Sequence, residues 1–212
     1  GRKRHRRRSP RLRSDGGLAA VDAARDNPVQ LLMSGPAGGV TGALWIARQS
    51  GFKNLLTFDM GGTSTDVALI ENGIAQTRRE TRVADVTVLA PSIDVRTVGA
   101  GGGSIAYVPE LTKALRVGPQ SAGADPGPAC YGRGGTDFTL TDALVILGLV
   151  DPDRFLGGEM RIDPALSEQA AQPLCARLGM TAEAVALSVF RIAVVNVAQA
   201  IRQTTVQRGR DP

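Results

Sequence analysis

Three short apolar runs in the first half of the chain predict a β meander. Asn54 to Asp59 and Asp66 to Glu71 each have the length of one strand. Glu71-Asn72-Gly73 is a turn signal that leads into a third run near Ile74 to Arg79. Because two glycines lie between the first two runs, we expect a tight glycine loop there.

Helical patterns flank this meander. Residues 18–26 and 37–50 have helical character, and the second segment follows Ser34-Gly35-Pro36, a combined cap and turn signal. In the last third, Thr141-Asp142 is expected to cap a short helix to Leu147, and Asp163-Pro164 to open a longer one that runs to Gly179.

A third helix in this part is expected to begin at Thr181. Its apolar residues recur on one face at helical spacing, which predicts a face turned toward the core. These residues are Leu187, Phe190, Val194, Val197 and Ile201. Polar residues interrupt the stretch from Ala184 to Ile201, so we interpret it as a buried helix rather than a membrane span.

Residues 99–135 hold ten glycines and four prolines, which is typical of a loop. The segment also contains aromatic, acidic and thiol side chains, which are less typical of a disordered linker: Tyr107, Asp125, Cys130 and Tyr131. Composition therefore leaves open whether it is a disordered connection or a structured binding loop.

The net charge of +5 over 212 residues comes from the N-terminus. Eight of the 25 Lys and Arg residues lie in the first 13 positions, so the remainder is mildly acidic. We expect residues 1–14 to be a basic, disordered tail of non-native origin, with a phosphate-neutralising arm for nucleic acid as the alternative. The tail has no aromatic residue to stack on a base, so nucleic acid is not an expected partner.

Several catalytic classes are excluded by composition. The single histidine, His5, lies in the tail, and Cys130 and Cys175 are far apart in the sequence. Zinc sites of Cys and His, Ser-His-Asp triads and Cys-His dyads all need residues that the body lacks. Two isolated cysteines and no signal-peptide pattern suit a reducing compartment, so we expect a cytoplasmic protein without a membrane partner.

The clearest chemical signal is the segment Asp59-Met60-Gly61-Gly62-Thr63-Ser64-Thr65-Asp66 between two apolar runs. Glycines let a turn present its main-chain N–H groups without an obstructing side chain, as phosphate oxygens require. We expect phosphate contacts from Gly61, Gly62, Thr63 and Ser64, with Asp66 supporting the loop. Asp59 would hold Mg²⁺ through water or orient an attacking water. The alternative is a plain glycine hairpin in which Asp59 only caps the turn.

A second glycine cluster spans Gly99 to Ser104. It is not a Walker loop, because no lysine follows it, and it is not a dinucleotide fingerprint, because Ser104 occupies the third glycine position. It is either a main-chain surface for an anion or a partner chain, or a flexible connection.

Four motifs in order carry a resemblance to a known family. Residues 34–40, 58–70, 94–106 and 123–132 together resemble the ATP-binding subunit of the hydantoinase/oxoprolinase family, which includes N-methylhydantoinase A, 5-oxoprolinase and acetone carboxylase β-type proteins. The resemblance covers roughly residues 13 to 212. It implies an α/β fold: a partial actin-like (ribonuclease H-like) ATPase domain over residues 15–212, with a glycine-rich insertion and a helical C-terminal part.

The resemblance also implies a chemistry. The family uses ATP and Mg²⁺ to phosphorylate the oxygen of a cyclic amide, such as a hydantoin or 5-oxoproline, before hydrolysis. It implies a second, hydantoinase B-type subunit or domain as partner. Related members activate ketones for carboxylation, which is one alternative. Intact members have another Asp-Gly-Gly-Thr motif upstream and a glycine-rich segment downstream, so a truncated, inactive internal fragment is the other.

Overall fold

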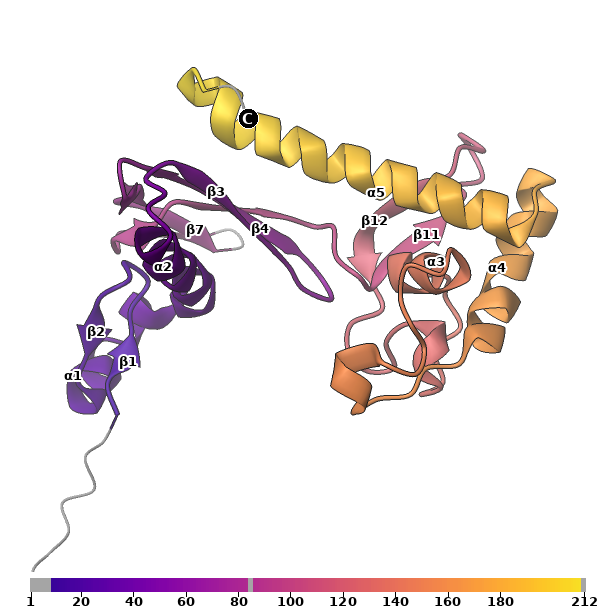
Figure 1. Ribbon diagram of the computed structural model, residues 1–212, viewed down its shortest axis with the longest axis horizontal. Coiled ribbons are helices and arrows are strands. Elements are labelled where there is room, and N and C mark those ends of the chain that lie inside the picture. The colour runs from indigo at the N-terminus through magenta and orange to yellow at the C-terminus, as the bar shows by residue number, and fades with distance from the viewer. Residues whose placement is uncertain (1–8, 84–85, 211–212) are drawn as a thin grey trace, which may run out of the picture. The chain divides into compact units, whose positions relative to one another are not determined.

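The computed structural model describes residues 9–83 and 86–210, and these form two compact units. Of the described residues, the first unit contains 9–59, 66–83, 86–96 and 204–210, and the second contains 60–65 and 97–203. Both mix helices and strands, as the predicted α/β class requires (Figure 1).

The first unit is built around a small sheet. The helices and strands that begin in it are β1 (Arg11–Leu12), β2 (Leu18–Ala19), α1 (Val21–Asp26), α2 (Ser34–Gln49), β3 (Leu55–Met60), β4 (Thr65–Glu71), β5 (Ile74–Ala75), β6 (Thr77–Arg78), β7 (Thr81–Val83), β8 (Val86–Val88), β9 (Ser92–Ile93) and β10 (Val95–Val98). The sheet has the strand order β10-β4-β3, and β5 also pairs with β4. The predicted meander is therefore correct for its first two strands. Its third run is divided, since β6 pairs with β9 instead.

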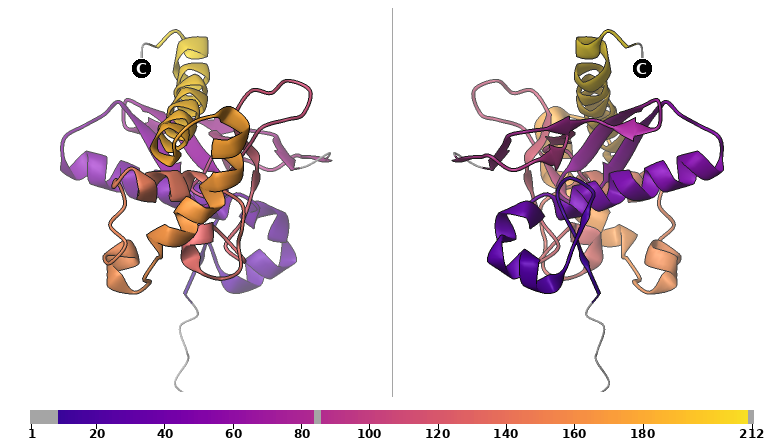
Figure 2. Two further views of the ribbon diagram at one scale, coloured as in Figure 1. Left: turned by 90° about the vertical axis from the view of Figure 1, so that its right-hand side faces the viewer. Right: turned by 90° about the vertical axis from the view of Figure 1, so that its left-hand side faces the viewer.

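Strand β4 lies at the centre of this sheet and is its most apolar segment. Val67, Ala68, Leu69 and Ile70 are all buried. Helix α2 contributes Ala37 and Val40 to the same core, and it lies along the sheet in Figure 2. Because successive strand residues face opposite sides of a sheet, α2 covers the side that carries Ala68 and Ile70, and Val67 and Leu69 face the other side.

The expected tail overlaps this unit. Arg11 and Leu12 form β1, which pairs antiparallel with β2, so part of the segment assigned to a disordered tail is folded. The amide of Ser14 donates to the carbonyl of Gln30 at 2.7 Å, and this places Ser14 in the fold as well. Residues 1–8 lie outside the described residues.

The second unit is mainly helical. Its elements are β11 (Ser104–Tyr107), β12 (Arg116–Ser121), α3 (Leu140–Ile146), α4 (Pro164–Leu178) and α5 (Ala182–Thr205), with short 3₁₀ helices at Ala129–Tyr131 and Phe155–Gly158. Strands β11 and β12 pair antiparallel, and their Ala106 and Val117 join the core formed by the three helices. The glycine-rich segment 99–135 is therefore a structured loop region.

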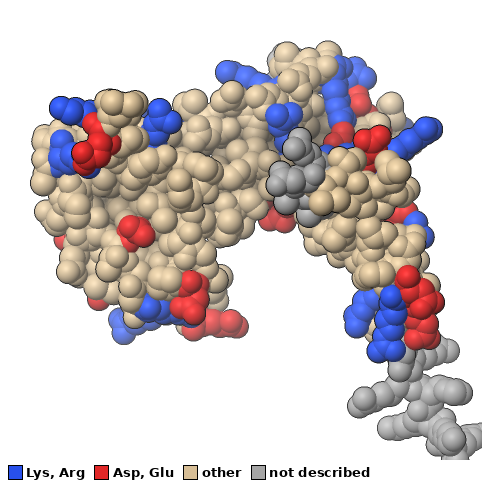
Figure 3. Space-filling view, turned by 180° about the vertical axis from the view of Figure 1, so that it is seen from behind, with Lys and Arg blue, Asp and Glu red and all other residues tan. Residues whose placement is uncertain are grey.

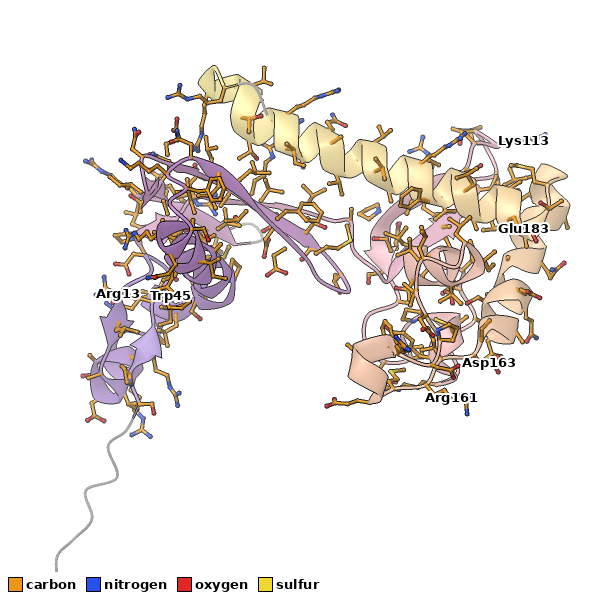
Figure 4. The ribbon with its side chains drawn as sticks, in the orientation of Figure 1. Arg13, Trp45, Lys113, Arg161, Asp163 and Glu183 are labelled. Carbon is orange, nitrogen blue, oxygen red and sulfur yellow. The ribbon has the colours of Figure 1, made fainter. Side chains whose placement is uncertain are left out.

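Local signals located two of these helices well. Helix α4 begins with Pro164 after the Asp163 cap, whose Oδ1 accepts from the amide of Ala165 at 2.9 Å, and it ends at Gly179 in the left-handed conformation. Asp163 lies at the start of α4 in Figure 4. For α3 the predicted cap was wrong, because Thr139 caps the helix and forms a capping box with Asp142.

The predicted core face of α5 was also wrong in part. Leu187 and Val194 are 38% and 48% exposed, whereas Val185, Ala186, Val189 and Ala193 are buried. The helix is apolar on more than one face, and the face with the smaller residues packs into the core. Among the described residues, one helix, Ala182–Arg208, is long and apolar enough to cross a membrane by length and composition. Part of it belongs to the hydrophobic core of the second unit.

Candidate phosphate-binding site

The glycine turn between β3 and β4 is exposed to solvent. The amide of Gly61 donates to the carbonyl of Ser64 at 2.8 Å and closes the turn. Gly61, Gly62 and Thr63 are exposed, and Ser64 is half-buried. The turn is therefore accessible to a ligand, as a phosphate site requires.

The second glycine cluster packs directly against this turn. The amide of Gly102 donates to the carbonyl of Gly61 at 3.0 Å, and the amide of Gly103 donates to the carbonyl of Gly62 at 2.6 Å. A Cβ on Gly101 would lie 2.7 Å from the Gly61 oxygen, so no side chain fits there. The cluster is thus neither a flexible connection nor an open anion surface. It is a main-chain support for the turn.

These two hydrogen bonds determine where the amides of the turn point. The peptide bonds 61–62 and 62–63 are trans, so each carbonyl and the following N–H point in opposite directions. Because the carbonyls of Gly61 and Gly62 point toward the support, the N–H groups of Gly62 and Thr63 point away from it. No described residue accepts a hydrogen bond from either amide. Two parallel donors are therefore available to an anion, and this arrangement matches the main-chain nests that bind phosphate.

Three hydroxyl side chains of the second unit hold the support in place. Thr65 Oγ1 donates to the carbonyl of Ala100 at 2.5 Å, and Ser104 Oγ accepts from the amide of Gly101 at 2.9 Å. Thr141 donates to the carbonyl of Gly102 from both its amide and its hydroxyl, each at 2.8 Å. Sequence reasoning missed the role of Thr141, because no local pattern signals a bond between residues 39 positions apart.

Asp59 and Asp66 belong to the first unit. Asp59 lies near the end of β3 and is exposed, and its Oδ2 is 3.3 Å from the position that a Cβ on Gly39 of α2 would take. No described residue forms a hydrogen bond or ion pair with the Asp59 carboxylate, so its oxygens are available to water or a cation. Asp66 is half-buried in β4.

The described residues include no group of three or more His, Cys, Asp or Glu side chains that could hold a metal ion. Mg²⁺ is commonly bound by one or two carboxylates together with substrate phosphates and water. An isolated, exposed Asp59 is compatible with that mode of binding, in which the ligand supplies the remaining oxygens.

The glycine-rich motif at 123–132 is held by one buried carboxylate. Asp142 accepts from the amides of Cys130 and Thr139 at 2.8 and 2.9 Å and from the hydroxyl of Ser167 at 2.9 Å. Burial, followed by the nearby Asp142 carboxylate, raises the pKa of the Cys130 thiol to about 12. Cys130 is therefore a protonated core residue at neutral pH and cannot act as a thiolate nucleophile.

Charged residues of both signs are spread over the surface. On the face shown in Figure 3, Lys and Arg alternate with Asp and Glu around largely uncharged regions. Ion pairs of the first unit include Arg78 with Asp94 at 3.8 Å and Arg210 with Glu71 at 2.6 Å.

The family model for hydantoinase/oxoprolinase proteins matches residues 4–212. The chain belongs to this family. The match includes most of the residues assigned to a tail. Curated relatives include caprolactamase subunit alpha of Pseudomonas jessenii, 37% identical over 95% of this chain and 29% of the relative. Acetophenone carboxylase gamma subunit of Aromatoleum aromaticum is 38% identical over 95% of this chain and 28% of the relative.

Solved structures agree with this assignment and with the α/β fold. One is a nucleotide-free structure of acetone carboxylase, from work on ATP-dependent acetone carboxylation. It superposes with a TM-score of 0.87 at 31% identity, over 96% of the present chain and 28% of the acetone carboxylase chain. ATP-dependent caprolactamase from Pseudomonas jessenii superposes with a TM-score of 0.80 at 36% identity, over 95% of this chain and 29% of that chain. The chain thus spans less than a third of the length of these relatives.

Proposed function

We propose that this chain is the phosphate-binding part of an ATP-dependent enzyme subunit that opens a cyclic amide of the hydantoin or 5-oxoproline type. The observation that carries the proposal is the exposed turn, in which the amides of Gly62 and Thr63 point outward and have no partner among the described residues. Similarity to caprolactamase, a protein named for a cyclic amide, supports this substrate class.

Each residue of the turn has a distinct role in this proposal. The amides of Gly62 and Thr63 bind phosphate oxygens, and Gly61 and Ser64 close the turn by their mutual hydrogen bond. Preorganised main-chain donors stabilise the charge of a transferring phosphoryl group without reorganisation. Asp59 holds the water shell of Mg²⁺, and Asp66 supports the loop from β4. Bound ATP supplies a phosphoryl group that turns the amide oxygen into a good leaving group.

We further propose a hydantoinase B-type partner subunit and a cytoplasmic location. Three relatives carry names of subunits, among them caprolactamase subunit alpha and the beta subunit of acetone carboxylase. Cys130 and Cys175 are free thiols, which suits a reducing compartment.

Substitution of Asp59 tests the proposal. In the complete protein that carries these 212 residues, Asp59→Ala is expected to abolish ATP turnover and to leave the melting temperature unchanged, because the side chain is exposed and unpaired. Asp22→Ala serves as the control. It also removes a carboxylate, but from α1, which is far from the turn in sequence. Undiminished turnover in Asp59→Ala would refute the role of this carboxylate.

A second candidate is ATP-dependent carboxylation of a ketone. The TM-score of 0.87 with acetone carboxylase and the similarity to an acetophenone carboxylase subunit favour it. Assays of ATP hydrolysis with hydantoin, 5-oxoproline and caprolactam, and separately with acetone or acetophenone plus bicarbonate, distinguish the two. If the complete protein binds ATP and the 212-residue chain alone does not, the alternative of an inactive fragment is correct.

A further inference from the structure

Thr141 connects the N-terminus of α3 to the support of the phosphate-binding turn. Both its amide and its hydroxyl donate to the carbonyl of Gly102, each at 2.8 Å. That carbonyl and the N–H of Gly103 belong to one planar peptide unit. Two donors on the Gly102 oxygen therefore fix the plane of the 102–103 peptide. At the opposite end of this plane, the N–H of Gly103 donates to the carbonyl of Gly62 at 2.6 Å.

The same reasoning carries one step further into the turn. The carbonyl of Gly62 and the N–H of Thr63 also share a peptide plane, and that N–H is one of the two outward-pointing amides. The order of contacts is thus Thr141, the 102–103 peptide, the 62–63 peptide, and then the anion. The two contacts within the protein are hydrogen bonds of 2.8 Å or less, so a displacement of Thr141 would tilt the donor at the far end.

The core of the second unit determines the position of Thr141. It is 6% exposed and lies in the first turn of α3, between Leu140 and Asp142, which are both buried. The Asp142 carboxylate closes the capping box with Thr139 and also accepts from Ser167 of α4. Thr141 is therefore held by packing and hydrogen bonds that do not involve the phosphate-binding turn.

We propose that Thr141 is a positioning residue for the phosphate-binding turn, acting through the carbonyl of Gly102. This inference rests on the proposed function, since it assigns a role in the same ATP site. In this proposal Thr141 acts through the support and not by its own contact with the nucleotide. It sets the direction in which the amide of Thr63 meets a phosphate oxygen.

The test compares three threonine variants of the complete protein. Thr141→Val keeps the shape of the side chain and loses the hydroxyl donor, and Thr141→Ser keeps the donor. Thr41→Val is the matched control, because Thr41 Oγ1 also donates to a main-chain carbonyl, that of Ala37 at 2.7 Å, but in α2. The measurements are the Kd for ATP and for adenosine by calorimetry, the melting temperature, and the ¹⁵N–¹H shift of the Thr63 amide without nucleotide.

For Thr141→Val we expect about a fivefold weaker Kd for ATP, the order of one lost hydrogen bond, with an unchanged Kd for adenosine. The Thr63 amide signal should shift in this variant even without nucleotide. Thr141→Ser should restore both values, and Thr41→Val should leave both as in the wild type. A purely structural role of Thr141 would instead lower the melting temperature and weaken ATP and adenosine binding together, and that result would overturn the proposal.

A double variant tests whether the effect passes through Gly102. A Cβ on Gly102 would lie 2.8 Å from Thr141 Oγ1, so Gly102→Ala alone should weaken ATP binding. In combination with Thr141→Ala the clash is removed, and the combined loss should be smaller than the product of the single losses. Independent, multiplicative losses would contradict the proposal. If the wild type binds no ATP, the proposed function and this inference are both refuted. If the wild type binds ATP, but Thr141→Val changes neither the ATP affinity nor the amide shift, only the inference is refuted.

Discussion

Substitution of Gly101 by alanine is the most direct test of the packing between the two glycine segments. The added Cβ would lie 2.7 Å from the Gly61 oxygen and from the Thr63 carbonyl carbon, and 2.8 Å from the Gly62 carbonyl carbon. All three are main-chain atoms, which cannot rotate away as a side chain can. Ordinary contact begins at 3.4 Å, so the turn must withdraw by about 0.7 Å.

This displacement has two measurable consequences. Overpacking of a close contact costs about 1–3 kcal/mol, which corresponds to a fall in melting temperature of roughly 2–12 °C for a protein of this size. Misplacement of a catalytic group by about 1 Å costs about 100-fold in rate, so ATP turnover should fall by up to that factor. Scanning fluorimetry and a coupled ATPase assay measure the two effects on the same preparation.

Gly42→Ala and Gly62→Ala are the matched controls, since no atom lies within 4 Å of a Cβ at either position. Gly42 lies inside α2, so alanine there should raise stability by up to about 1 kcal/mol. Gly62→Ala should keep the melting temperature but weaken ATP binding, because its methyl group lies beside an outward-pointing amide. A Gly101→Ala protein with wild-type stability and wild-type turnover would show that the two segments are not packed as described.

Three further predictions concern other parts of the chain. Asp142→Asn should lower the free energy of unfolding by about 3 kcal/mol or more in urea titrations, because it places an NH₂ group among buried donors. The control Asp163→Asn should lower it much less, because Asn remains a good helix cap there. Because burial raises the pKa of Cys130 to about 12 from 9.0, the unfolded thiol ionises first as the pH rises above 9, and stability should fall from there toward pH 12. This alkaline loss should be smaller in Cys130→Ser, and an equal loss in both would contradict the assignment. Arg208→Ala, which removes the ion pair with Asp94, should cost less than about 1 kcal/mol, because both side chains are partly exposed; a larger loss in urea titrations would mean that this pair anchors the C-terminal segment.

Features with a local signature were predictable from the sequence. The cap at Asp163, the proline at the first position of α4 and the left-handed Gly179 all lie where the pattern put them. The strands on both sides of the glycine turn were also predicted, because an apolar run bounded by turn residues has few other conformations. The turn itself was identified as a phosphate-binding candidate from the same local pattern.

Features that depend on several competing faces or caps were not predictable. Helix α5 has apolar residues on more than one side, so its periodicity could not show that Val185 and Val189 are buried and Leu187 is exposed. Similarly, Thr139 and Thr141 are both good caps, and the choice of Thr139 depends on Asp142 being buried against Ser167. Arg11 and Leu12 were assigned to a charged tail, because the density of basic residues gives no information on their pairing with β2.

By itself, the sequence determined helix α4, the strands β3 and β4, the glycine turn and the family, because caps, apolar runs and motifs lie in neighbouring residues. Only the tertiary structure decided that Gly101 to Gly103 support the turn and that Thr141 holds them. The contacts between the support and the turn are main-chain hydrogen bonds between segments about 40 residues apart, for example from Gly102 to Gly61. Such bonds use groups that every residue carries, so the only trace that they leave in a single sequence is a glycine where a side chain would not fit.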